Sequence, residues 1–198
     1  FITSPLSDRL TAAEKEKEKE GRYDMGKNNP WRYQNRSFLG DMSFGKLGEK
    51  KVETLLKSSR NVAEVFDLRD DKEAQKKDID YKVFYKDGRE CLVEVKTDKW
   101  AHRTGNIPFE MYSHNNPGCF ARTESDFIFF VVAMTGMIYV IDSRKLKEYA
   151  NRLLENGEKL KTMGDEARGF LCKIETLKKE GIIVQQIETP PLAMANAA

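Results

Sequence analysis

The run Asp78-Ile79-Asp80-Tyr81-Lys82-Val83 is followed, after a polar turn, by Leu92-Val93-Glu94-Val95-Lys96-Thr97. Both runs contain the β-branched and aromatic residues that favour strands. The turn between them includes Lys86-Asp87-Gly88-Arg89, and an Asp-Gly pair between two such runs is a strong signal for a β-hairpin. The sequence therefore predicts two paired strands, over 79–85 and 91–97.

The second strand of this hairpin has two unlike faces. Residues two apart in a strand point to the same side, so Glu94 and Lys96 share one face. Val93 and Val95 point to the opposite face, and this apolar side is typical of a central strand packed on a core. Charged side chains on the other face of a central strand then indicate a functional site.

Pairing across the turn brings Asp80 into the region of Glu94 and Lys96, and Asp78 is expected on the same face as Asp80. Two carboxylates and one ammonium group then meet at one end of a sheet. Carboxylates are hard oxygen ligands for Mg²⁺ or Mn²⁺, which also bind phosphate oxygens and water. The arrangement therefore suits phosphodiester hydrolysis, with a solvated salt-bridge cluster as the alternative.

The rest of the chain alternates helical and strand-like patterns. An apolar stripe at helical spacing covers 41–56, and Asp142 or Ser143 can cap a helix that runs to Leu154. Strand-like runs cover 62–68, 107–112, 126–133, 137–141, 169–174 and 182–187, and a short helix is expected at 175–180. This order predicts one α/β domain with a mixed central β-sheet flanked by helices.

Composition divides the chain into three predicted parts. Residues 1–37 are expected to form a polar helix or arm, 38–188 the α/β domain, and 189–198 a flexible tail. The 198 residues, with 39% hydrophobic content, can bury one core without disulfide support. Collagen-like and wholly disordered chains are excluded by this composition.

No stretch approaches the roughly 20 apolar residues that a membrane-spanning helix requires, and the first residues lack the pattern of a secretory signal. Cys91, Cys119 and Cys172 are an odd number without a CxxC pair. They are expected to be reduced thiols rather than a disulfide or zinc framework. We therefore expect a cytoplasmic protein with no membrane partner.

Basic side chains between residues 22 and 60, Arg36 among them, are interleaved with aromatic ones. This mixture suits phosphate contacts and base stacking, and an ordinary basic surface is the alternative. A net charge of +2 and a pI near 8.3 are too mild to identify nucleic-acid binding by themselves.

Asp80 followed by Glu94-Val95-Lys96 after a hairpin resembles the PD-(D/E)xK nuclease superfamily. That superfamily includes Holliday-junction resolvases, many restriction endonucleases and phage recombination nucleases. Asp78-Ile79-Asp80 is similar to the Gly-Ile-Asp segment of its resolvase-like members, with Asp78 in place of the usual glycine or proline. The resemblance implies a restriction-endonuclease-like core.

The resemblance also implies the roles of the motif residues. Asp80 and Glu94 would bind Mg²⁺ or Mn²⁺, the Val95 carbonyl is a further ligand, and Lys96 would assist the attacking water. The family places another glutamate on the helix before the sheet. Glu49 is the better match for it, and Glu53, one turn further along the helix, remains a rival. No organic cofactor is implied.

A second match follows the Glu-x-Lys strand. Gly105-Asn106 before a strand with Glu110, then Pro117-Gly118, is similar to phage-type members, although Cys119 separates the glycine from the expected aromatic residue. Glu110 can act at the site or pair with a nearby lysine. The segment after the strand, which includes Trp100, can touch the DNA backbone or be an ordinary polar loop. The predicted nucleic-acid contacts are Lys99, Arg103, Asn106, Glu110 and Arg36.

The arrangement of carboxylates and lysine predicts a divalent-metal-dependent nuclease, and the resemblance implies an endodeoxyribonuclease of the Holliday-junction-resolvase-like or phage recombination and repair type. Junction resolution needs two symmetric cuts, so a homodimer is expected for that activity. A phage-encoded protein would act in the host cytoplasm. The alternative is a nucleic-acid-binding module that keeps the fold without cutting, and a small-molecule phosphohydrolase is disfavoured because no Walker-type loop is present. DNA versus RNA and the substrate structure stay open.

Overall fold

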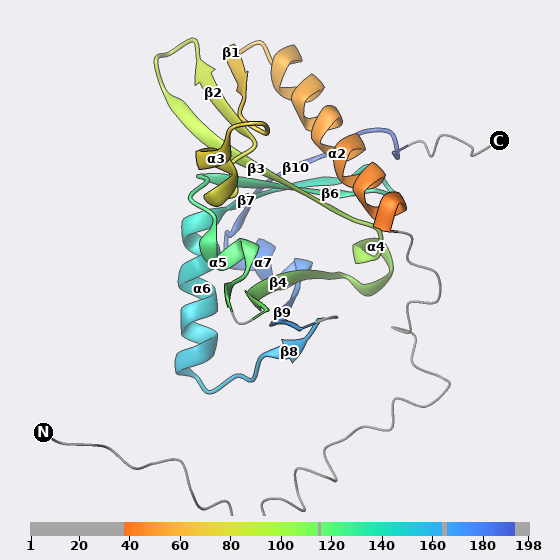
Figure 1. The fold of residues 1–198 in the computed structure, drawn as a ribbon, viewed down its shortest axis with the longest axis vertical. Helices are drawn as coiled ribbons and strands as arrows, with labels where there is room; N and C mark the ends of the chain where they lie inside the picture. The colour runs from red at the N-terminus through yellow and green to blue at the C-terminus, as the bar shows by residue number, and fades with distance from the viewer. Residues whose placement is uncertain (1–37, 115, 164–165, 193–198) are drawn as a thin grey trace, which may run out of the picture. The chain divides into compact units, whose positions relative to one another are not determined.

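The computed structural model describes residues 38–114, 116–163 and 166–192, and its centre is a six-stranded sheet (Figure 1). The strands, in spatial order, are β1 (Val62–Asp67), β2 (Tyr81–Tyr85), β3 (Glu90–Asp98), β6 (Phe127–Val132), β7 (Ile138–Asp142) and β10 (Ile183–Ile187). β3 and β6 run parallel, and the other neighbours are antiparallel. The sheet is mixed, as the sequence predicts.

Helices cover both faces of this sheet (Figure 1). On one face, the apolar stripe of α2 (Phe38–Ser58) packs Val52 and Leu56 against Val93 and Val95. On the other, α6 (Ser143–Glu155) packs into a second apolar cluster, and Asp142 caps it by accepting a hydrogen bond from the Lys145 nitrogen at 2.9 Å. The predicted α/β architecture with flanking helices is therefore confirmed.

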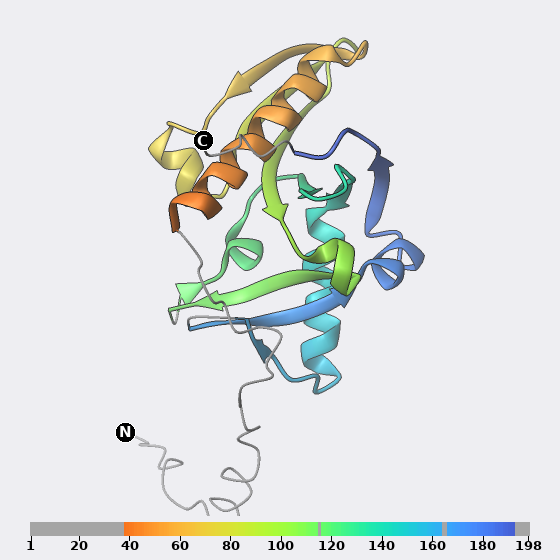
Figure 2. The same cartoon turned by 90° about the vertical axis from the view of Figure 1, so that its right-hand side faces the viewer.

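A second sheet of four strands lies below the end of β3 (Figure 2). Its strands, in spatial order, are β5 (Asn116–Pro117), β4 (Asn106–Ser113), β9 (Ala167–Lys173) and β8 (Lys161–Thr162). Phe109 on β4 pairs with Phe170 on β9, and both side chains are buried in the same core cluster as Phe130 of the central sheet. The sequence predicts β4 and β9 as strands but does not place them in a separate sheet.

Four short helices complete the described residues: α3 (Lys72–Lys76), α4 (Ala101–Thr104), α5 (Cys119–Arg122) and α7 (Ile174–Lys179). The sequence predicts α7 but assigns no helix or strand to the region of α3. α3 forms there because the Asp71 carboxylate accepts hydrogen bonds from the Glu73 and Ala74 nitrogens, each at 2.9 Å. No helix in the described ranges is long and apolar enough to cross a membrane.

The ends of the chain are described only in part. Residues 1–37, the predicted arm that includes Arg36, lie outside the described residues, and so do residues 193–198. Residues 189–192 belong to the predicted tail, but they make defined contacts. The Leu192 nitrogen donates to the Ala133 oxygen at 2.9 Å, and Lys51 Nζ donates to the Pro190 oxygen at 2.6 Å.

Candidate active site

The hairpin of β2 and β3 places Asp80 beside the middle of β3. The pairing of the two strands begins with Tyr81 opposite Val93, and the Asp80 nitrogen donates to the Val93 oxygen at 2.8 Å. The next nitrogen of β3 on this side, that of Val95, is bonded by a side chain instead of a backbone group. It donates a hydrogen bond to Asp80 Oδ2 at 2.7 Å. The carboxylate is therefore fixed at the point where β2 begins.

Glu94 and Lys96 project from β3 on the face opposite the Val93 and Val95 side chains and form an ion pair with each other. The Glu94 side chain is only 4% exposed, whereas that of Lys96 is 30% exposed. The alternation that the sequence predicts is confirmed. Because Glu94 is buried, the alternative of a solvated salt-bridge cluster does not describe this site.

Burial and mutual repulsion perturb the two carboxyl groups. Burial raises the pKa of Glu94 to about 7; the Lys96 charge opposes this rise and the Asp80 charge adds to it. Burial also raises the pKa of Asp80, against the effect of the Val95 hydrogen bond, and the Glu49 charge raises this pKa further. Burial alone would lower the pKa of Lys96, but the charge and hydrogen bond of Glu94, together with the charges of Cys119 and Asp78, raise it overall and keep the ammonium form. A bound cation would relieve the repulsion between the carboxylates.

Glu49 lies on α2, and its carboxylate is held by Arg69. Arg69 Nη1 lies 3.1 Å from Glu49 Oε2, and Arg69 Nη2 lies 3.4 Å from Glu53 Oε2. The same guanidinium group pairs with Asp67 and lies 5.1 Å from the centre of the Tyr81 ring. One arginine therefore pairs with three acidic side chains beside the start of β2.

The two glutamates that compete for the helix position differ in their surroundings. The Tyr81 hydroxyl donates to the Glu49 carbonyl oxygen at 3.1 Å, and the Glu49 charge acts on Asp80. Glu53 also pairs with Lys57, whose Nζ lies 2.5 Å from Glu53 Oε1. These contacts favour Glu49 over Glu53, although its role as a ligand remains a prediction.

The donor atoms at this site suit a hard divalent cation. Asp80 and Glu94 offer carboxylate oxygens, and the Val95 carbonyl remains a predicted further donor. Among the residues that the structure describes, no group of three or more His, Cys, Asp or Glu side chains is arranged to hold a metal ion. The site therefore fits an ion held by two carboxylates, whose other ligands would come from water and phosphate oxygens.

The prediction that Asp78 shares a strand face with Asp80 is wrong, because β2 begins only at Tyr81. The φ of Asp78 is +48°, a left-handed conformation that aspartate tolerates. The Asp78 carboxylate accepts two hydrogen bonds from Arg122, at 2.7 and 2.8 Å, and the Thr123 hydroxyl donates to the Asp78 oxygen at 2.9 Å. Sequence reasoning missed Arg122 and Thr123, since no local pattern connects them with Asp78.

The middle of β4 adjoins the site through α5. A β-carbon on Gly118 would lie 2.6 Å from the Glu110 carbonyl oxygen, so only glycine allows this approach. The next residue, Cys119, is in a partly buried position; burial raises the pKa of its thiol to about 11, while the Lys96 charge lowers it and the Glu110 charge raises it. Glu110, Cys119 and Lys96 are therefore electrostatic neighbours.

The other predicted nucleic-acid contacts follow β3. Lys99 Nζ lies 4.0 Å from the centre of the Phe44 ring on α2, and the Arg103 guanidinium lies 5.7 Å from the centre of the Trp100 ring. Asn106 is the first residue of β4. The structure thus places Lys99, Arg103 and Asn106 on one segment that leads from the active strand into the second sheet.

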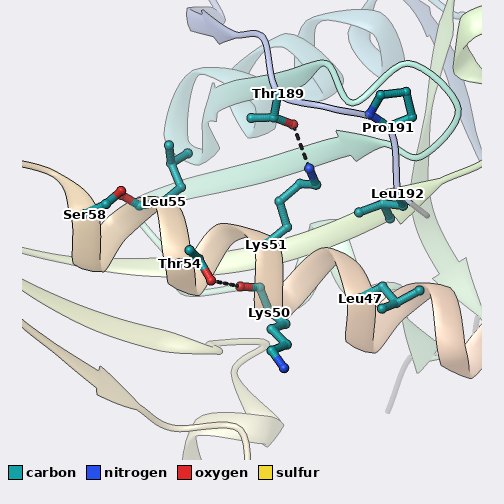
Figure 3. Close-up of a pocket in the computed structure, with 9 residues that line it drawn as sticks. All are labelled: Leu47, Lys50, Lys51, Thr54, Leu55, Ser58, Thr189, Pro191 and Leu192. Carbon is teal, nitrogen blue, oxygen red and sulfur yellow. Dashed lines mark hydrogen bonds between the residues drawn. The ribbon is translucent and has the colours of Figure 1, made fainter. Parts of the chain in front are cut away.

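A groove of about 420 Å³ lies elsewhere, between α2 and the segment that follows β10 (Figure 3). It is lined by Leu47, Lys50, Lys51, Thr54, Leu55, Ser58, Thr189, Pro191 and Leu192. Helical spacing places these α2 residues on the flank opposite Glu49 and Glu53. The lining carries no carboxylate, so this groove is separate from the candidate active site.

Comparisons with known proteins return one likeness in structure. No protein-family model matches the chain, and no curated protein matches its sequence. The structure is similar to that of a bacterial homing endonuclease, I-Ssp6803I, with 16% identity and a TM-score of 0.38. The match covers 52% of this chain and 68% of that one. A likeness at this level identifies no function for this chain.

Proposed function

We propose that this protein is a divalent-metal-dependent nuclease of the PD-(D/E)xK type that hydrolyses phosphodiester bonds in DNA. The observation that carries this proposal is the convergence of three side chains. The Asp80 carboxylate, bonded to the Val95 nitrogen, lies beside the ion pair of the buried Glu94 with Lys96. Two carboxylates with a lysine provide both a cation site and a proton-bearing group for hydrolysis.

Each residue has a defined role in this proposal. Asp80, Glu94 and the Val95 carbonyl would hold Mg²⁺ or Mn²⁺, and Glu49 would be a further ligand if it were released from Arg69. The bound ion supplies the positive charge that activates water and stabilises the transition state. Lys96 stays protonated, orients the attacking water and neutralises charge on the phosphate.

The proposed contacts with nucleic acid surround these residues. Lys99, Arg103 and Asn106 follow the active strand, Glu110 lies on the neighbouring β4, and Arg36 belongs to the basic segment outside the described residues. Cations in this position would bind backbone phosphates. A substrate of the Holliday-junction or recombination type would require a homodimer, which presents two such sites.

Cleavage of a labelled panel tests the function: single-stranded, duplex, flapped and four-way-junction DNA, together with RNA. Each substrate is incubated with Mg²⁺, Mn²⁺ or EDTA, and Asp80→Asn and Lys96→Met are run beside the wild type. Metal-dependent cutting that both variants lose supports the nuclease. The preferred substrate then names its class.

A non-catalytic nucleic-acid-binding module is the second candidate, and one observation favours it. Glu49 is held by Arg69, and the described part of the chain has no three-acid metal cluster. In this case the panel would be bound but not cut under any metal condition. Mn²⁺ titration by calorimetry separates the candidates further, because the module would also bind no metal at Asp80 and Glu94.

A further inference from the structure

Two exposed aromatic side chains, each paired with an arginine, lie at the two ends of β4. Trp100, the residue before α4, which leads into β4, is 40% exposed and has the Arg103 guanidinium 5.7 Å from its ring centre. Tyr112, near the end of β4, is 38% exposed and has the Arg168 guanidinium 5.5 Å from its ring centre. Each pair presents a flat ring and a flat cation to solvent.

The first pair is held on a fixed backbone. The Asp98 carboxylate accepts hydrogen bonds from the Trp100 nitrogen, at 2.6 Å, and from the Ala101 nitrogen. Ala101 is 1% exposed and belongs to the core, and the Gly105 nitrogen donates to its carbonyl oxygen at 2.8 Å. The Trp100 ring therefore stays at the surface on a backbone that is anchored on both sides.

The second pair is held by strand pairing. Tyr112 lies directly opposite Arg168 on β9, and on its other side it pairs with Pro117 on β5. A register shift between Glu110 and Tyr112 separates this pair from the regular part of β4. Such a bulge re-aims the side chains that follow it.

The candidate active site adjoins the middle of β4, between the two pairs. Gly118 packs directly on Glu110, and the next residue, Cys119, lies where both Glu110 and Lys96 act on its thiol. Figure 2 shows β4 crossing below the end of β3, with α4 at its start and β5 at its far end. A strand of this length spans about 25 Å, which is enough for several nucleotides.

We propose that the Trp100–Arg103 and Tyr112–Arg168 pairs stack unpaired nucleobases on either side of the cleaved phosphate. Aromatic rings and arginine planes are the surfaces on which single-stranded nucleic acids stack, and every base offers a flat face to them. A base inside a closed duplex cannot reach such a platform. The ligand is therefore a nucleic acid with a single-stranded segment across the site. This inference rests on the proposed nuclease function and names its substrate class.

Binding is measured without cleavage, in EDTA, by the anisotropy of labelled single-stranded and blunt duplex oligonucleotides, each as DNA and as RNA. Trp100→Ala and Tyr112→Ala are compared with Trp100→Phe, Tyr112→Phe and the wild type. Leu171→Ala is the matched control, because this side chain is 36% exposed on the same sheet but is not part of either pair. Each aromatic-to-alanine change is expected to weaken single-strand binding about 5- to 100-fold. The phenylalanine variants and the Leu171 control should bind like the wild type.

Fluorescence gives a second readout that a structural role of Trp100 would not change. The chain has two tryptophans, Trp31 and Trp100, so in a Trp31→Phe background the emission comes from Trp100. Single-stranded oligonucleotides are expected to quench it, and blunt duplex should not.

The outcomes separate the two proposals. Cleavage with unchanged single-strand binding in both alanine variants overturns the stacking platform alone, and so does an equal loss of duplex binding. Binding that depends on Trp100 and Tyr112, without metal-dependent cleavage, supports the platform and overturns the nuclease. The absence of any binding to nucleic acid overturns both.

Discussion

Asp80 Oδ2 accepts a hydrogen bond from the Val95 nitrogen at 2.7 Å, so the first motif carboxylate also completes the pairing of the active strand. A carboxylate has two oxygens and about four lone-pair sites, and one hydrogen bond leaves capacity for a metal ion. The Asp80 side chain therefore serves both the strand pairing and the proposed metal binding. A substitution that keeps the hydrogen bond but removes the charge can separate these two roles.

Asp80→Asn should separate them. The amide oxygen can still accept the Val95 hydrogen bond, so unfolding in urea should change little, but the loss of charge should abolish metal-dependent cleavage. Asp80→Ala removes the acceptor as well and should lower the free energy of unfolding by about 1–3 kcal/mol. Equal stability of the two variants would show that the Val95 contact contributes nothing to folding.

Glu94→Gln should stabilise the metal-free protein in a pH-dependent way. The pKa of Glu94 is raised from 4.5 to about 7 in the folded state, so the folded protein binds this proton more tightly than the unfolded chain does. The contribution of Glu94 to stability therefore decreases as the pH rises from about 4.5 through 7. The neutral amide removes this loss and should raise the free energy of unfolding near pH 8 by roughly 1–3 kcal/mol, with little effect near pH 5.

Thermal unfolding in EDTA at the two pH values measures this effect. Adding Mn²⁺ should stabilise the wild type and leave Glu94→Gln nearly unchanged, because the variant lacks a carboxylate ligand. A variant that is destabilised equally at both pH values would contradict the assignment of an ionised, buried Glu94.

Features that depend on residues close together in the sequence could be predicted, and contacts between distant residues could not. The turn at Asp87-Gly88 and the alternation of Val93 and Glu94 are local signals, and they suffice to place Asp80 beside β3. The Arg122–Asp78 pair joins residues 44 positions apart, and no turn or periodicity encodes it.

The second sheet has the same explanation. Phe109 and Phe170 pair across a long connection that contains β5, α5, β6, β7, α6 and β8, so only burial in a shared core brings them together. Arg69 lies in a charge-rich segment between β1 and α3. From the sequence, its three acidic partners on α2 and β1 cannot be distinguished from ordinary surface charges.

Arg69→Gln tests whether Glu49 is withheld from the metal. The substitution removes the guanidinium that pairs with Glu49 and Glu53, so Glu49 should become available and the affinity for Mn²⁺ should increase several-fold. Calorimetric titration measures the affinity. Glu53→Gln is the control, because it removes one ion pair of Arg69 but leaves both Arg69 and Glu49 in place. A weaker affinity in Arg69→Gln would mean that Arg69 positions Glu49 for the ion rather than competing with it.

Gly118→Ala should disturb the site through the backbone. A β-carbon there would lie 2.6 Å from the Glu110 carbonyl oxygen and 2.8 Å from Glu110 Cγ, so α5 must move away from β4. We expect a loss of about 1–3 kcal/mol in the free energy of unfolding. Cleavage should also fall, because α5 carries Cys119 and Arg122 at the site.

Gly45→Ala is the matched control for this change. A β-carbon on Gly45 meets no atom within 4 Å, and the residue lies inside α2, where alanine is favoured over glycine by up to about 1 kcal/mol. Urea denaturation should therefore show Gly45→Ala as stable as the wild type or more stable. If Gly118→Ala unfolded like this control and cut normally, the close approach of α5 to Glu110 would have no part in shaping the site.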